Sequence, residues 1–303
     1  MSKLHVTLFG RFCVRFAGQE LVDIAVQKVQ ELFCYLLLHR RQPHHREKLS
    51  AVLWGDYSTT QAKTYLRKAL WQMRQALSDI SLEVNCPILL TDTEWLQLNP
   101  DLPLYLDTAV FEQVYRKVRG KMPPDINLTH QQDMEYAIRL YQGDLLEGWY
   151  QDWCIYERER FEFNYLSMLD KLLQLCEYQQ LYEVGVRYGQ RILHHDEARE
   201  HTHVSLMRLY YLAGNRTQAL RQYQCCAEIL LQELGVEPSQ RTQELYEAIK
   251  HDNLLEIITF YDQGTYQPPS LQQTLNHLQN LQGILGHMQA KIEHEIAEVK
   301  DIL

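Results

Sequence analysis

The segment 59–77 constrains the fold most, because its apolar residues recur with the period of an α-helix and cover only one side of it. Ser58 or Thr59 can cap the start of this helix through a side-chain oxygen. A helix with one apolar side needs other elements to pack against, so the segment predicts a globular domain built around it. The apolar positions are Ala62, Leu66, Ala69, Leu70, Met73 and Leu77.

The opposite side of this predicted helix is basic. Residues 59–78 contain four Lys or Arg side chains and no Asp or Glu. On a solvated face, basic residues are ordinarily interspersed with acidic ones, so a helix without acids is a candidate surface for an anionic partner. The side chains expected on this face are Thr60, Thr64, Arg67, Lys68, Trp71 and Gln75, with Lys63 and Arg74 flanking them.

Short strands and two further helices surround the basic helix in the sequence. The turn before it contains Gly55, and a hairpin with a short polar tip follows it. Strands, three helices and a hairpin, in that order, predict an α+β winged helix-turn-helix domain over residues 1–105. The expected strands are 4–9 and 12–16, the helices are 26–39, 46–54 and 59–77, and the hairpin pairs 88–90 with 95–98.

From about Leu106 onward only helical patterns remain, which predicts an all-α domain over residues 106–252. Apolar positions repeat at a spacing of 34 residues, as in stacked helix–turn–helix units of the tetratricopeptide type. In this repeat, Leu172 recurs as Leu206, Leu175 as Leu209, Gly185 as Ala219 and Val186 as Leu220. The expected helices are 108–119, 130–142, 157–178, 181–195, 198–213, 216–233 and 239–250.

The last part of the chain has a different pattern. Residues 253–270 read as a linker with Pro268 and Pro269, and residues 271–303 show a seven-residue apolar repeat. A heptad repeat predicts an amphipathic helix that either forms a coiled-coil homodimer or folds back on the helical domain. The expected dimer contacts are Leu271, Leu278, Leu285, Ile292 and Val299.

Charge is distributed unevenly along the chain. The net charge is −9, yet residues 1–100 hold 12 Lys and Arg against 9 Asp and Glu, while the remainder holds 18 against 30. A contact with nucleic acid is therefore expected from the N-terminal third. No apolar run approaches the ~20 residues that span a bilayer, and the start of the chain reads as a strand, so we expect a cytoplasmic protein that makes no membrane contact.

The sequence offers no candidate for catalysis or for a bound cofactor. The seven cysteines are scattered without a CxxC pair, the histidines lack metal-ligand spacing, and no nucleophile lies in a converging polar set. We therefore expect no enzyme activity, no metal and no cofactor. A small-molecule ligand for the helical domain is conceivable from the sequence, but no motif identifies one.

Six landmarks in a fixed order resemble a known family. They are LFG at 8–10, KVQEL at 28–32, REKL and LWGD at 46–56, LRKAL and MRQAL at 66–77, YQGDLL at 141–146 followed by Trp153 and ERER at 157–160, and ELGVEPS at 233–239 followed by Leu245-Tyr246. The first ~105 residues resemble an OmpR-like winged helix, and the next ~150 resemble the bacterial transcriptional activator domain. Together they are similar to the Streptomyces antibiotic regulatory protein (SARP) family.

The resemblance implies a transcriptional activator that binds promoter DNA and contacts RNA polymerase through the helical domain. Many relatives carry a nucleotide-binding module after the helical domain, but no GxxxxGK[ST] loop occurs in this sequence. The wing tip also departs from expectation, since it holds Asp92 and Glu94, which would repel phosphate. We therefore expect the wing to contribute little to DNA binding.

Within the major groove, the N-terminal half of a recognition helix reaches base edges. Thr60, Lys63, Thr64 and Arg67 are the expected base readers, and Lys68, Trp71 and Arg74 are expected to meet the backbone. Arg46 and Lys48 begin the second helix, where a phosphate can bind, although a solvated surface is the open alternative.

The sequence thus predicts a DNA-binding transcriptional regulator that acts on double-stranded DNA as a homodimer. The alternative is a tetratricopeptide-type scaffold or ligand-binding protein whose winged helix binds DNA non-specifically or not at all.

Overall fold

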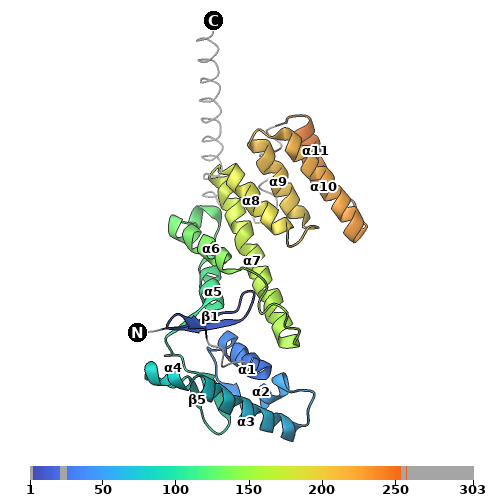
Figure 1. Cartoon of the computed structure of the whole chain (residues 1–303). Coiled ribbons are helices and arrows are strands. Elements are labelled where there is room, and N and C mark those ends of the chain that lie inside the picture. The colour runs from blue at the N-terminus through green and yellow to red at the C-terminus, as the bar shows by residue number, and fades with distance from the viewer. Residues whose placement is uncertain (1–2, 21–25, 254–256, 258–303) are drawn as a thin grey trace. The chain divides into compact units, whose positions relative to one another are not determined.

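The computed structural model describes residues 3–20, 26–253 and 257, and the chain divides into two compact units, residues 1–238 and 239–303 (Figure 1). The expected dimer contacts Leu271, Leu278, Leu285, Ile292 and Val299 lie outside the described residues, as does most of the expected linker. The boundaries predicted for the individual domains stay a prediction.

The first unit opens with a four-stranded sheet. Its strands are β1 (Leu4–Thr7), β2 (Cys13–Phe16), β3 (Gln19–Glu20) and β7 (Leu104–Leu106), in the spatial order β3-β2-β1-β7. β1 pairs antiparallel with β2 and parallel with β7. Burial alternates along β1, where Leu4 and Val6 are buried and His5 and Thr7 are exposed, as the two-residue period of a strand requires.

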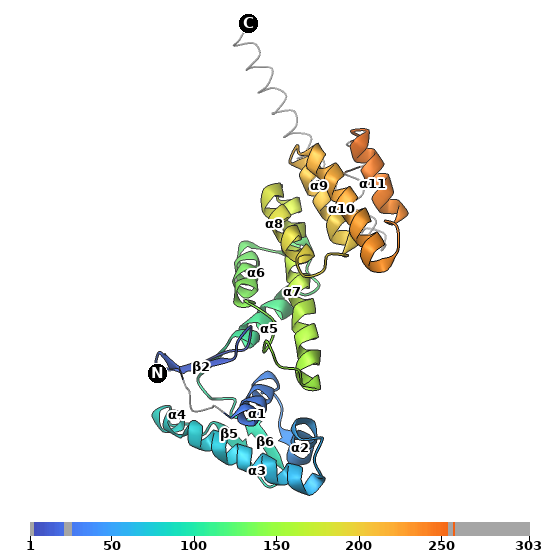
Figure 2. The same cartoon turned by 45° about the vertical axis from the view of Figure 1, so that its right-hand side comes forward.

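Three helices and a second sheet complete the winged helix, as the sequence predicts (Figure 2). The helices are α1 (Gln27–Leu38), α2 (Arg46–Leu53) and α3 (Thr59–Ala76), and a short α4 (Ser78–Glu83) follows. The second sheet has the order β4-β6-β5, with β4 at His44–His45, β5 at Leu89–Thr91 and β6 at Trp95–Leu98. The wing hairpin is in register, since Leu90 lies opposite Gln97.

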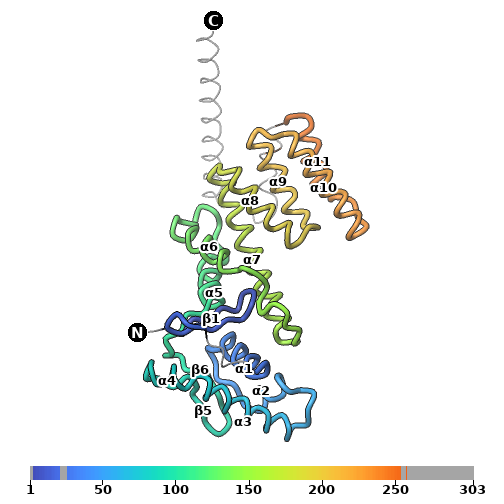
Figure 3. The backbone as a smooth tube through the Cα atoms, in the orientation of Figure 1, coloured from blue at the N-terminus to red at the C-terminus, as the bar shows by residue number. Residues whose placement is uncertain are grey.

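The helical part begins directly after β7, and its helices lie close to the expected positions (Figure 3). They are α5 (Asp107–Val118), α6 (Leu128–Leu140), α7 (Asp152–Tyr178), α8 (Tyr182–Leu193), α9 (Glu200–Leu212) and α10 (Arg216–Leu234), with a 3₁₀ turn, η1, at Pro123–Asp125. α7 starts five residues before its predicted start at 157. The second unit contains α11 (Gln240–Lys250), whose Ser239 Oγ accepts a hydrogen bond from the Thr242 N–H at 3.4 Å.

The 34-residue repeat marks the core of the helical stack. Leu172, Leu175, Leu206 and Leu209 are all buried. Gly185 and Gly189 let α8 approach its neighbours closely, because a Cβ on Gly189 would lie 2.6 Å from a Leu206 methyl carbon. The repeat therefore reports real packing between α7, α8 and α9.

Two of the sequence landmarks contact each other across a joint within the first unit, between the first sheet and the helical part. The Leu146 N–H donates to the Leu8 carbonyl at 2.8 Å, and the Gly10 N–H donates to the Asp144 carbonyl at 2.8 Å. The Gly143 position is tight, since a Cβ there would lie 3.3 Å from the Gly10 Cα. Backbone pairing thus holds 8–10 and 144–147 together.

A buried carboxylate strengthens the same joint. Asp107, at the start of α5, is 2% exposed and accepts hydrogen bonds from the N–H groups of Leu8 at 2.8 Å and Phe9 at 3.0 Å. Burial raises the pKa of Asp107 to about 6, although these hydrogen bonds oppose the rise. Nearby, the Arg158 guanidinium donates to the carbonyls of Leu145, Leu146 and Trp149.

The sequence analysis missed β3, β4, β7 and α4. Each of these elements has two to six residues, too few to establish a hydrophobic period. β7 also owes its position to parallel pairing with β1, about a hundred residues earlier in the chain, and no local pattern encodes that pairing. Within the described residues, no helix has both the length and the apolar content needed to cross a bilayer.

Candidate nucleic-acid interface

The position of α3 is set by its start and by the turn that precedes it. Ser58 and Gln61 form a capping box, in which each side chain accepts the other's backbone N–H. Gly55 lies in the turn after α2, and a Cβ there would come within 2.9 Å of the Ala51 carbonyl oxygen. Glycine is therefore favoured at the turn that ends α2 and leads into α3.

The buried face of α3 is the stripe that the sequence predicts, with Ala62, Leu66, Ala69, Leu70 and Met73 all inside the core. The opposite face is open to solvent. Thr60, Thr64, Arg67 and Trp71 follow each other at helical spacing on it, and Trp71 is 62% exposed. An exposed tryptophan of this size beside cations is unusual for a surface without a partner.

Two cations on this face are uncommitted. Arg67 and Lys68 are exposed and form no hydrogen bond or ion pair with the described part of the chain. With no acidic residue anywhere on α3, no carboxylate from the helix itself offsets them. The centre of the face is therefore a positive surface with its donors available.

Lys63 lies differently from its expected place on this face. It is half-buried toward α2, and its Nζ pairs with Glu47 Oε1 at 2.6 Å. The hydrogen bond from Lys63 and its charge lower the pKa of Glu47. The cation that the sequence assigns to base reading is thus paired with a carboxylate of the preceding helix.

Two more of the expected contact residues are held by neighbours. Thr64 Oγ1 donates to the Thr60 carbonyl at 3.0 Å, one turn earlier in α3. Arg74 Nη2 donates to Thr91 Oγ1 at 2.7 Å, which ties the end of α3 to the wing strand β5. Thr91 is the functional neighbour that sequence reasoning missed, because it lies in a different element from Arg74.

The start of α2 is partly occupied. The Arg46 backbone N–H, one of the donors expected for phosphate, instead donates to the Glu94 carbonyl at 2.8 Å. The Arg46 side chain is half-buried with its Nε unpartnered, whereas Lys48 is exposed. The structure brings Arg46 next to the wing rather than to the exposed face of α3.

The acidic wing tip has a local structural role. Asp92 Oδ1 accepts the N–H groups of Glu94 at 2.8 Å and Trp95 at 2.6 Å, and these bonds lower its pKa. Trp95 is also exposed and lies edge-on to His45 with 5.3 Å between ring centroids. Among the described residues, no set of three His, Cys, Asp or Glu side chains is placed to hold a metal ion.

Comparison with known proteins agrees with the fold. A family model described as the bacterial transcriptional activator domain matches residues 106–250, so the chain contains this domain. A solved structure of Mycobacterium tuberculosis EmbR in complex with a low-affinity phosphopeptide matches with a TM-score of 0.63 at 17% identity. The match covers 83% of this chain and 66% of that chain, so this chain spans just under two thirds of the EmbR chain.

The comparison with curated proteins finds no match. At 17% identity the likeness to EmbR is a likeness of fold: a winged helix followed by an all-helical domain. The domain match and this fold agree with the order of domains that the sequence predicts, a winged helix followed by a bacterial transcriptional activator domain.

Proposed function

We propose that this chain, with its bacterial transcriptional activator domain, activates transcription by binding promoter DNA through the exposed face of α3. The observation that carries the proposal is α3 itself: the helix has four basic residues and no acidic one, and Arg67 and Lys68 are exposed on its open face. The proposal assigns no catalytic step to the chain and places it with the DNA in the cytoplasm.

The geometry of α3 supports insertion into the major groove. The groove is about 12 Å wide and admits one α-helix. α3 has 18 residues, and its side chains face outward from Thr60 to Arg74 along one side. In this arrangement, Arg67 and Thr64 reach base edges, while Lys68, Trp71 and the wing-held Arg74 meet the sugar–phosphate backbone.

In this proposal Lys63 contacts DNA only when its ion pair with Glu47 opens. Solvent screens its ion pair with Glu47, so breaking the pair costs little stability. A phosphate or a guanine edge can compete for Lys63 at that cost. In this proposal Lys48, which is exposed on the first turn of α2, contacts phosphate, and Arg46 supports the wing.

The helical part is assigned to protein contacts. Tyr156, on the first half of α7, is 73% exposed. Large exposed aromatic side chains are enriched at protein interfaces. RNA polymerase is the partner that activation requires, and the predicted heptad segment 271–303 is assigned to homodimerisation.

Fluorescence anisotropy with the DNA upstream of the protein's own coding region tests the proposal. Arg67→Ala should weaken specific binding about tenfold or more, because a bidentate arginine–guanine contact contributes about 1–3 kcal/mol. The affinity of the Arg67→Ala variant should also depend less steeply on salt concentration, since its binding releases one fewer counterion. The matched control is Arg187→Ala, an exposed arginine on α8, which should bind as the unchanged protein does.

Transcription from the same fragment with purified RNA polymerase tests the activating role. Transcript yield should rise with the unchanged protein and stay at the basal level with Arg67→Ala. Equal DNA affinity for both variants at every salt concentration would contradict the role of α3. That result would favour the alternative, a helical scaffold whose winged helix does not bind DNA specifically.

A further inference from the structure

An arginine-lined cleft lies in the first unit, away from the exposed face of α3. Its volume is about 710 Å³, within the range of small-molecule sites. Three parts of the chain form its walls: the end of α1 with the turn after it, α5, and the first half of α7. Five arginines and two glutamates line it: Arg40, Arg41, Arg116, Arg119, Arg160, Glu112 and Glu157.

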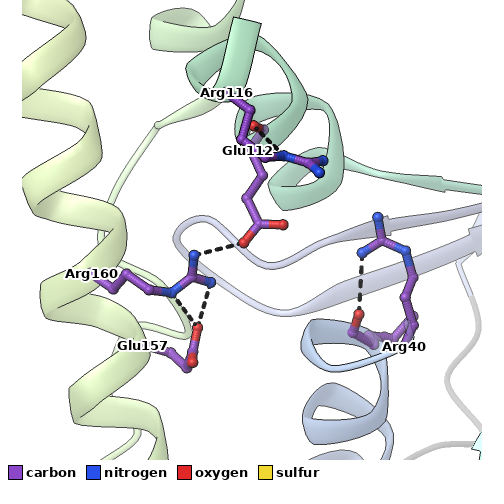
Figure 4. Close-up of polar contacts among 6 residues, drawn as sticks. Arg40, Glu112, Arg116, Glu157 and Arg160 are labelled. Atoms are coloured by element: carbon purple, nitrogen blue, oxygen red, sulfur yellow. Dashed lines mark hydrogen bonds and ion pairs between the residues drawn. The ribbon is translucent and has the colours of Figure 1, made fainter. Parts of the chain in front are cut away.

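A single arginine bridges the two glutamates. Arg160 Nη1 lies 2.7 Å from Glu112 Oε1, and its Nη2 lies 2.6 Å from Glu157 Oε2, so it bridges α5 and α7 (Figure 4). Burial opposes the charge of Arg160, but the bonds to both carboxylates outweigh it and raise the pKa of Arg160. The bridged triad keeps one negative charge, so with the four other arginines the lining carries five positive charges against two negative ones, a net positive charge.

Those four cations keep donors for a ligand. Arg40 donates to the Leu37 carbonyl and Arg116 to the Glu112 carbonyl, each through one nitrogen (Figure 4). Arg41 and Arg119 are exposed and make no hydrogen bond or ion pair with the described residues. Burial lowers the pKa of Arg40, and the charges of Arg41 and Arg116 lower it further against the opposing effect of Glu112.

The walls also supply groups other than cations. Asn164 on α7 is 6% exposed and lines the cleft, and its side-chain amide makes no hydrogen bond within the described part of the chain. Phe163 beside it is largely exposed, and Tyr115 of α5 lies in the same wall. An amide and two aromatic rings beside four cations suit a ligand that has a planar ring as well as negative charge.

We propose that this cleft binds a phosphorylated small molecule of nucleotide size. Arg41, Arg116 and Arg119 hold its phosphate groups, since guanidinium forks pair with phosphate through two parallel bonds. The ring moiety lies against Phe163 and Tyr115, within reach of Asn164. Such a ligand contacts the end of α1 and both α5 and α7 at once, so it ties the winged helix to the helical part.

A concave site favours this ligand over duplex DNA. The DNA backbone presents a convex surface, whereas the cleft is a hollow with walls on three elements. Glu112 and Glu157 at its side would also repel a continuous line of phosphates, but they leave room for one or two phosphates at Arg41 and Arg119. The inference does not depend on whether α3 binds DNA.

Isothermal titration calorimetry on the full chain tests the proposal, with ADP, GDP and inorganic pyrophosphate as probes and adenosine as the uncharged comparison. At least one diphosphate should bind saturably at a single site, and adenosine should bind at least tenfold more weakly. Arg41→Ala and Arg119→Ala should each weaken binding about tenfold, the usual loss for a charge-assisted contact. Arg187→Ala, outside the cleft, should bind within twofold of the unchanged protein.

Three results would overturn the proposal. The first is the lack of saturable binding by all three charged probes up to about a hundredfold excess over protein. The second is binding that Arg41→Ala and Arg119→Ala leave unchanged. The third is a loss of DNA affinity in these two variants without any diphosphate binding, which would make the cleft a contact for the DNA backbone. Both variants lie on the surface and should keep the circular dichroism spectrum of the folded chain.

Discussion

The joint at the first sheet and the stack of α7 to α9 lie in the same compact unit but are held by different forces. Polar groups hold the joint. Asp107 accepts hydrogen bonds from the N–H groups of Leu8 and Phe9, which follow β1. Arg158 donates hydrogen bonds to three backbone carbonyls in the segment that precedes α7. Apolar close packing holds the stack, with Gly189 admitting Leu206 between the helices. The joint therefore depends on a few satisfied hydrogen bonds, and the stack depends on how closely the side chains fill the space between its helices.

This difference also decides which region can be read from the sequence. The stack is local: each helix packs on its neighbour, and the leucines recur at a spacing of 34 residues, as Leu172 and Leu206 do. The joint brings together residues about 100 to 140 positions apart, and its polar groups follow no period. Substitutions in the two regions should therefore change the free energy of unfolding by different amounts and for different physical reasons.

Removing the carboxylate from the joint should have the largest effect. Asp107→Ala leaves the N–H groups of Leu8 and Phe9 buried without acceptors, and each such donor costs about 1–3 kcal/mol. We expect a loss of about 4 kcal/mol in the free energy of unfolding. The shift in the urea midpoint, followed by circular dichroism, measures it.

A control separates this role from the mere loss of an aspartate. Asp133 on α6 pairs with Lys117 at the surface, and Asp133→Ala should change stability by less than about 1 kcal/mol. Asp107→Asn keeps one acceptor oxygen, so its urea midpoint should lie between those of Asp107→Ala and Asp133→Ala. If Asp107→Ala unfolds at the same urea concentration as Asp133→Ala, the joint does not depend on this carboxylate.

Adding volume to the stack should have a smaller effect. A Cβ on Gly189 would lie 2.6 Å and 2.9 Å from the Cδ2 and Cγ atoms of buried Leu206, so α8 and α9 must move apart. Overpacking of this kind costs about 1–3 kcal/mol, and the better helix propensity of alanine returns about 1 kcal/mol. We expect Gly189→Ala to lower the free energy of unfolding by up to about 2 kcal/mol, measured by urea denaturation.

A second variant distinguishes loss of space from loss of glycine flexibility. The double variant Gly189→Ala with Leu206→Ala frees the space that the new methyl group needs. If steric crowding is the cause, the two substitutions should cost less together than the sum of their separate effects. Additive costs would point to a cause other than contact with Leu206.

The same contrast explains what the sequence could and could not predict about the candidate site. The stripe of α3 and its capping Ser58 are encoded within 20 residues, so helix, face and cap are predicted correctly. The pairings of Lys63 with Glu47 and of Arg74 with Thr91 join separate elements, and sequence spacing carries no signal for them. The arginine cleft was missed for the same reason, since its cations come from three distant segments.

The smallest effect on stability is expected at the surface of the helix-turn-helix. The Lys63 side chain is 42% exposed and that of Glu47 is 62% exposed, so water screens their ion pair, and Lys63→Ala should shift the urea midpoint less than Asp107→Ala or Gly189→Ala does. Glu47→Gln breaks the same pair but leaves Lys63 free to meet DNA. If α3 lies in the major groove, Glu47→Gln should bind promoter DNA a few-fold more tightly and Lys63→Ala more weakly. Anisotropy at two salt concentrations measures both, and matching changes in the two variants would mean that Lys63 serves only the contact between α2 and α3.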